Sequence, residues 1–70
     1  MKILELSKEI YSSIAIDNTI TVFNHLATIN KTETRHTWKL LFRRCKYDEK
    51  RTILEFENYL IGIENQNGHH

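Results

Sequence analysis

The chain contains a single cysteine, Cys45, and therefore cannot form an internal disulfide bond. This matters because the chain has only 70 residues, and a domain of that size buries only about 60% of the surface that its unfolded chain exposes. Its core is expected to supply roughly 3–5 kcal/mol of net stability. The sequence also lacks the Cys-X-X-Cys pairs of structural zinc sites. Association is the remaining source of stability, so the sequence predicts a homodimer or a tight complex with another protein.

Composition excludes several classes of protein. Hydrophobic residues make up 40% of the chain, which is typical of a folded domain, and the formal charge of +1 is not that of a protein that coats nucleic acid or an acidic membrane. The longest apolar runs, such as residues 40–42, are too short to span a bilayer. Glu5 interrupts what would be the apolar core of a signal peptide. With one cysteine, these features predict a cytoplasmic protein with no membrane partner.

The N-terminal third predicts a strand followed by a helix. Alternation over residues 2–7 indicates a short strand with Leu4 and Leu6 facing the core. Ser12 is suited to cap a helix over about residues 13–26. The apolar stripe of that helix has helical spacing and consists of Ile16, Ile20, Phe23 and Ala27.

A hairpin is the competing interpretation of residues 14–22. Asp17 and Asn18 lie between two stretches rich in β-branched residues, which is a hairpin pattern. The helix is favoured because its apolar stripe is longer and Ser12 is well placed as its cap. The sequence leaves the hairpin open as the alternative.

Two strands are expected next. Residues 28–33 are weakly apolar and predict an edge strand, and residues 37–46 predict a second strand after a polar turn. In the second strand Trp38, Leu40 and Phe42 share one face. The opposite face is mixed and carries Lys39, Leu41, Arg43 and Cys45.

A second helix closes the predicted fold. Asp48 is suited to cap it, and Gly62 fits the position just after its C-terminus. The residues after it form a polar tail, within which His69 and His70 carry no weight in the functional inference. Its apolar stripe is formed by Ile53, Phe56, Leu60 and Ile63 and is widened by Leu54 and Ile61.

The order strand, helix, strand, strand, helix predicts one α+β domain over residues 1–63 and a polar tail over residues 64–70. A right-handed crossover would place both helices on one face of a three-stranded sheet. The other face would stay open, with Ile3 and Leu41 among charged neighbours. An open face and two short edges are surfaces that a partner can use. The residues expected to bind a partner are Lys39, Leu41 and Arg43.

Catalytic groups are weakly represented. Cys45 with His25 or His36 is the only formal nucleophile and base, with Arg44 and Lys46 able to lower the thiol pKa. Cys45 is more simply a half-buried strand residue, and the same three side chains do not have the spacing of a metal site. A phosphate-binding glycine loop is excluded because no glycine precedes Gly62. The sequence therefore predicts a protein that is not an enzyme, with no catalytic residues, metal or cofactor.

Binding to RNA is the alternative function, with a structural subunit of a larger complex as a third. Basic residues lie close to aromatic residues along residues 38–47, a combination found on RNA-binding sheets. The alternation, however, points Trp38 and Phe42 away from Lys39 and Arg43. The basic residues of this stretch are more simply a charged edge that discourages aggregation.

The chain resembles a known family in two stretches. Residues 6–12 read Leu-Ser-Lys-Glu-Ile-Tyr-Ser and lead into a helix, and residues 53–62 read Ile-Leu-Glu-Phe-Glu-Asn-Tyr-Leu-Ile-Gly. In these, and over about residues 3–62, the chain resembles the small HxsD-like family of His-Xaa-Ser peptide systems. Longer members continue beyond the point where this chain ends.

The resemblance implies an accessory protein for the modification of ribosomally made peptides by a radical enzyme. The iron–sulfur cluster and the chemistry would then belong to the partner enzyme. This chain would be a non-catalytic adaptor that binds the precursor peptide, the enzyme, or both. We expect a leader segment of the precursor to add as a strand beside residues 28–33 or at another exposed edge.

Overall fold

The computed structural model describes residues 2–67, and the side chains of residues 2–65. Three strands and two helices follow in the predicted order, which confirms the small α+β fold. The elements are β1 (Lys2–Ser7), α1 (Ser13–Phe23), β2 (Thr28–Glu33), β3 (Thr37–Arg43) and α2 (Glu49–Asn67).

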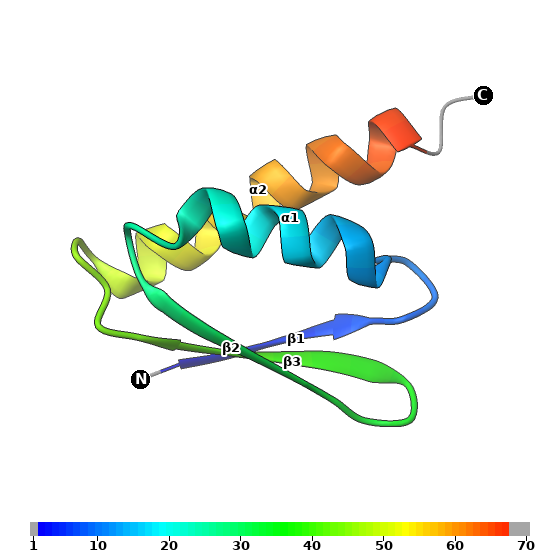
Figure 1. The fold of residues 1–70 in the computed structure, drawn as a ribbon, viewed down its shortest axis with the longest axis horizontal. Coiled ribbons are helices and arrows are strands. Elements are labelled where there is room, and N and C mark those ends of the chain that lie inside the picture. Colours follow the sequence, from blue (N-terminus) through cyan, green and yellow to red (C-terminus); the bar gives the residue numbers. More distant parts are fainter. Residues whose placement is uncertain (1, 68–70) are drawn as a thin grey trace.

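The three strands form one antiparallel sheet in the order β1-β3-β2, so β3 is central and the other two are edges (Figure 1). The strand 28–33 is an edge as predicted. Alternation along the strands places Leu6, Leu40 and Phe42 on the face toward the helices, where all three are buried. Leu4 and Trp38 are half-buried on the same face. The assignment of sides from the sequence is therefore confirmed.

Residues 14–22 form a helix, and the hairpin alternative is wrong. The Ser12 hydroxyl accepts a hydrogen bond from the Ala15 amide at 3.2 Å, as a cap does. Ala15, Ile16 and Thr19 are fully buried, so one side of α1 provides core. The helix ends at Phe23 and not near residue 26, because residues 24–26 form a turn in which Leu26 and Ala27 both donate to the Phe23 carbonyl.

The second helix begins where the sequence predicts. The Asp48 carboxylate accepts from the Arg51 amide at 2.9 Å. The predicted end at Gly62 is wrong, since α2 continues to Asn67. Gly62 does not have a positive φ, which the glycine after a helix usually adopts. Residues 64–67 of the predicted tail are thus helical, and residues 68–70 lie outside the described residues.

Contacts between residues that are far apart in the sequence stabilise the C-terminal part of α2. The Glu64 carboxylate accepts from the Ser12 amide at 2.7 Å and from its hydroxyl at 3.1 Å. The last turns of α2 therefore hold the start of α1, so ordering residue 64 gains two hydrogen bonds that no local pattern contains.

The strand predicted over residues 37–46 is three residues too long. Arg44 has a φ of 52°, in the left-handed region, which breaks the extended geometry directly after Arg43. Beyond it, the Lys46 amide donates to the Leu26 carbonyl at 2.7 Å. Cys45 therefore lies in the connection to α2 and not within the strand.

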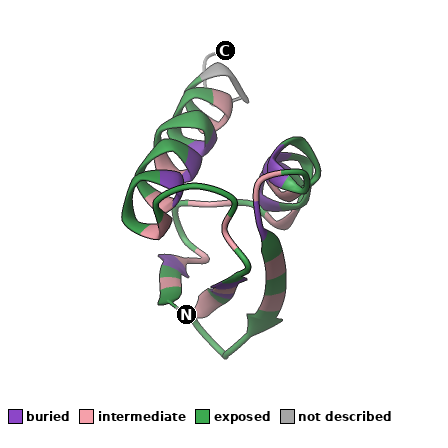
Figure 2. Cartoon of the chain, turned by 90° about the vertical axis from the view of Figure 1, so that its left-hand side faces the viewer, coloured by how far each residue is buried: buried purple, intermediate pink, exposed green. Residues whose placement is uncertain are grey.

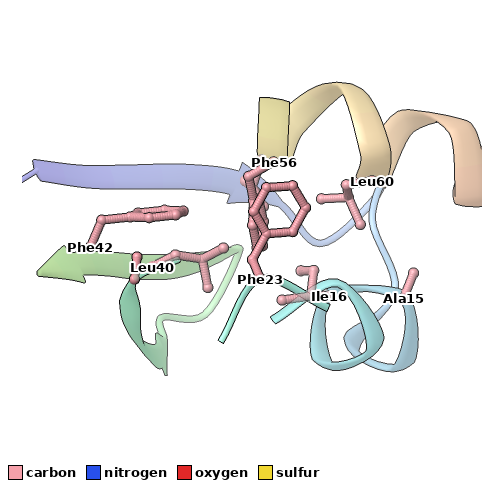
Figure 3. Packing of buried hydrophobic residues seen from close by; sticks show 9 residues of the cluster. Ala15, Ile16, Phe23, Leu40, Phe42, Phe56 and Leu60 are labelled. Atoms are coloured by element: carbon pink, nitrogen blue, oxygen red, sulfur yellow. The ribbon is translucent and has the colours of Figure 1, made fainter. Parts of the chain in front are cut away.

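Three phenylalanines form the centre of the core (Figure 3). The ring of Phe56 lies edge-on to Phe23 at 5.4 Å and to Phe42 at 5.2 Å between centroids. Phe56 thus joins α2 to both α1 and β3. Leu54 and Ile61 do not widen this core, because they are 58% and 42% exposed. Only three strands lie beneath the helices, so no strand reaches this flank of α2 among the described residues.

Both helices lie on one face of the sheet, as predicted (Figure 2). In this view α1 stands above β2, and α2 lies toward the opposite side, where β1 is the edge strand. The other face of the sheet meets no helix in the described part of the chain.

Candidate interaction surface

The surface most open to a partner is the sheet face opposite the helices, here called the open face. Strand register defines its rows. Ile3 of β1, Leu41 of β3 and Asn30 of β2 form one row, and Glu5, Lys39 and Thr32 form the next. All three predicted binding residues, Lys39, Leu41 and Arg43, lie on this face of the central strand.

The middle of the open face is apolar. Ile3 is 65% exposed and pairs with Leu41, which is half-buried. When a partner covers this pair, few polar atoms lose their contact with water. Each Å² of apolar surface that is covered contributes about 25 cal/mol to the free energy of binding. The pair is therefore suited to meet one apolar side chain of a partner.

Charged groups surround that apolar pair. Glu5 lies opposite Lys39 and accepts a hydrogen bond from the Thr37 hydroxyl at 3.1 Å. The Arg43 guanidinium donates to the side-chain carbonyl of Asn30 at 2.7 Å, and this acceptor belongs to a neutral amide. A guanidinium that is bound to one neutral acceptor still has N–H groups that can donate hydrogen bonds to a carboxylate. The open face can thus combine an apolar contact with recognition of an acidic group.

Sequence reasoning missed the parts of this surface that other strands supply. Asn30 and Glu5 stand beside Arg43 and Lys39 because of strand register. Register depends on which strands pair, and alternation within each strand does not contain that information. The sequence therefore placed Lys39 and Arg43 beside Leu41, but it could not identify the residues that lie next to them on the other strands.

The structure does not bring Cys45 and His36 together, whereas His25 lies in the turn beside the Cys45 segment, since the next residue, Leu26, accepts a hydrogen bond from the Lys46 amide at 2.7 Å. Burial raises the pKa of the Cys45 thiol, and the negative charges of Glu49 and Asp48 raise it further, so the expectation that Arg44 and Lys46 lower it is wrong. A raised pKa makes the reactive thiolate scarcer. His36 lies in the β2–β3 turn, with the length of β3 between it and Cys45. Within residues 2–67 no group of three or more His, Cys, Asp or Glu residues is placed to hold a metal ion.

The aromatic rings needed for stacking on RNA are mostly turned inward. Phe42 is fully buried, and Trp38 faces the helices with its indole N–H donating to the Tyr11 carbonyl at 3.1 Å. Tyr47 is 66% exposed, with the Lys46 ammonium 5.8 Å from its ring centre. One exposed ring beside a basic group is a small stacking surface compared with that of RNA-binding sheets.

Trp38 is the centre of a charged cluster at the other end of the sheet. The ammonium groups of Lys8 and Lys31 lie 4.7 Å and 5.0 Å from its ring centre. Lys8 pairs with Glu33, and Lys31 with Asp17, both at 2.5 Å. Lys31 also donates to the Ser13 hydroxyl at 2.8 Å, which ties β2 to the first turn of α1. The cluster has its opposite charges paired internally and is a structural feature more than a binding site.

The Lys8–Glu33 pair makes stability depend on pH. The hydrogen bond from Lys8 lowers the pKa of Glu33 below its usual value near 4.5, and the charge of Lys8 lowers it further. Burial opposes these two effects, and the charge of Lys31 adds a smaller lowering. A lowered pKa gives stability that is fully present above the unfolded value and is lost as pH falls through the folded value. We therefore expect the stability gap between the native chain and Glu33→Gln to be constant above about pH 5.5 and to close below about pH 4.5.

Urea unfolding between pH 3 and 7 measures this gap. Glu9→Gln is the matched control, because Glu9 is an exposed carboxylate in the turn after β1 with no salt bridge among the described residues. A gap for Glu33→Gln that stayed constant through pH 4 would contradict the assignment.

The chain was compared with protein-family models, with curated proteins and with solved structures, and none of them matches it. The resemblance to the HxsD-like family therefore stays a prediction. Among the described residues no helix is long and apolar enough to cross a membrane.

Proposed function

We propose that this chain is a non-catalytic adaptor domain that binds another protein or peptide. The open face carries this proposal, since no helix covers it within residues 2–67 and its centre is the exposed Ile3 beside Leu41. Exposed apolar side chains rimmed by polar groups are a common mark of protein interaction sites. Lys39 and Arg43 would give that contact its selectivity for an acidic partner surface.

The small core supports the same proposal. Among the described residues nine buried hydrophobic side chains form it, and two of them are alanines. A domain with so few large buried side chains gains stability whenever a partner binds only the folded state. Binding would thus serve both function and stability.

The proposed partners are a ribosomal precursor peptide and a radical iron–sulfur enzyme that modifies it. The resemblance of residues 6–12 and 53–62 to the HxsD-like family supports this choice. In such a complex the open face would meet the enzyme, and the adaptor would hold the peptide near it.

The test is a pull-down with the chain, followed by mass spectrometry with and without nuclease. A radical iron–sulfur enzyme or a short precursor peptide that survives nuclease would support the adaptor. The purified partner should then bind Arg43→Glu about tenfold or more weakly, because a charge-assisted hydrogen bond is replaced by repulsion. Arg35→Glu is the control, since it makes the same change at an exposed position in the β2–β3 turn.

Three results would overturn the proposal. Recovery of only nuclease-sensitive, RNA-associated proteins would favour RNA binding. Equal binding by Arg43→Glu and the native chain would remove the open face from the contact. Unfolding of Arg43→Glu would show that the side chain is structural.

A further inference from the structure

The flank of α2 that faces away from α1 is uncovered and partly apolar. Tyr59 contacts Phe23 of α1, with 6.0 Å between ring centres. At 3.6 residues per turn, Ile53 and Ile61 lie on the opposite side of the core-facing Phe56 from Tyr59. A shallow hollow runs along α2, and its lining includes Lys50, Ile53, Leu54 and Glu57. Since α2 lies on the β1 side of the sheet, this flank overhangs the free edge of β1 (Figure 2).

The two edges of the sheet differ in how well they are protected. On β2 the side chains facing the helices are Ile29, Lys31 and Glu33, and the cluster around Trp38 holds the two charged ones in place. Inward-pointing charges on an edge strand oppose the addition of another strand. On β1 the corresponding side chains are Lys2, which is the first residue of the strand, and then Leu4 and Leu6, so the middle and the end of this edge carry no such charge. The edge of β1 is therefore the receptive one.

The topology points to the same place. Sheets built as β-α-β-β-α-β have a further strand after the second helix, and a right-handed crossover from β3 over α2 places that strand beside β1. Residues 2–67 form the first five elements of this pattern, β-α-β-β-α, and within them β1 pairs only with β3. A strand beside β1 would lie antiparallel to it and beneath Ile53.

We propose that the free edge of β1 binds an extended peptide segment of a partner, which adds as a fourth, antiparallel strand beneath α2. This inference rests on the proposed adaptor function and names the element that takes the peptide. It assigns the peptide to β1 and not to residues 28–33. The open face then stays free for the second partner.

A second copy of the chain fits this edge poorly. Antiparallel pairing of β1 with itself must keep side chains on matching faces. Centring the pairing on Leu4 places Lys2 beside Leu6 and Ile3 beside Glu5. Moving the centre to Glu5 places the Glu5 residues of the two copies opposite each other, and like charges in that position are destabilising. Moving the centre to Ile3 places Lys2 beside Leu4 and shortens the pairing. A peptide of different sequence avoids these mismatches.

Neighbouring side chains define the peptide that fits. Beside Leu4 and Leu6 it needs apolar residues that contact the underside of α2. Between them, beside Glu5, it needs a lysine or arginine. The recognised core is thus an apolar residue, a basic residue and an apolar residue in extended conformation.

The probe is the synthetic peptide Thr-Thr-Val-Lys-Val-Thr-Thr with blocked ends. Two N-methylated forms of this peptide test backbone pairing. One form is methylated at the amides of both valines. The other is methylated at the amides of the lysine and of the threonine two residues after it. Alternate amides of an antiparallel strand face its neighbour, so one form should bind at least about tenfold more weakly than the unmethylated peptide, and the other should bind like it. Amide exchange of β1 followed by NMR should slow by about tenfold or more on saturation.

A protein variant provides an independent check. Leu4→Lys gives β1 the inward charge that Lys31 gives β2 and should abolish binding of the probe. Thr32→Lys is the control on β2, where the side chain is exposed. The methylated peptides keep the test valid if Leu4→Lys fails to fold.

Each other outcome overturns the inference. Equal weakening by both methylated forms, slowed exchange on β2 in place of β1, or no binding of the probe would each do so. Slowed exchange of β1 that grows with protein concentration alone would assign the edge to a second copy. The adaptor proposal fails separately, through the Arg43→Glu measurement on the purified partner.

Discussion

Phe56→Ala is expected to leave the isolated domain largely unfolded at 25 °C. Truncating a buried phenylalanine costs about 3–5 kcal/mol, and a domain of this size has roughly 3–5 kcal/mol of net stability in total. Phe56 is fully buried, and its ring meets one ring from α1 and another from β3. The cavity would therefore open at the point where both helices and the sheet meet (Figure 3).

Circular dichroism with urea titration measures this effect. Tyr47→Ala is the control, because Tyr47 is 66% exposed and its loss should change stability by about 0.5 kcal/mol or less. Phe56→Leu should fall between the two, since it keeps most of the buried volume. A native urea midpoint for Phe56→Ala would show that the packing is not as described.

Trp38→Ala is expected to have the second-largest effect, about 2–3 kcal/mol of lost stability. The indole packs against the core, donates to the Tyr11 carbonyl and carries the ammonium groups of Lys8 and Lys31 over its ring. It therefore joins the loop before α1 to the end of the sheet. The cost is below that of Phe56 because Trp38 is only half-buried.

Trp38→Phe separates packing from hydrogen bonding. Phenylalanine keeps an aromatic ring but leaves the Tyr11 carbonyl without the indole donor, so a loss of about 1 kcal/mol is expected. Both variants are measured by urea unfolding against Tyr47→Ala. Equal losses for Trp38→Phe and Trp38→Ala would mean that the hydrogen bond dominates and that ring packing contributes little.

The proposed interaction surface could be anticipated from the sequence only in part. Alternation along β3 was enough to place Lys39, Leu41 and Arg43 on one face, because side chains of a strand alternate whatever surrounds it. The register that sets Glu5 beside Lys39 and Asn30 beside Arg43 could not be read from any single strand. The proposed binding edge of β1 could not be recognised from the sequence either, because the charges of Lys31 and Glu33 protect β2 only if their side chains face the helices, and the register decides that.

The sequence by itself determined the features whose causes are local. Strand alternation and the caps at Ser12 and Asp48 depend on neighbours within a turn, and the order of elements and the choice of core face followed from them. Tertiary structure alone decided the length of α2, which Glu64 extends by holding Ser12 across 52 residues. It likewise decided the exposure of Leu54 and Ile61, because burial of an apolar side chain requires a neighbour to cover it, and no strand of the described residues lies there.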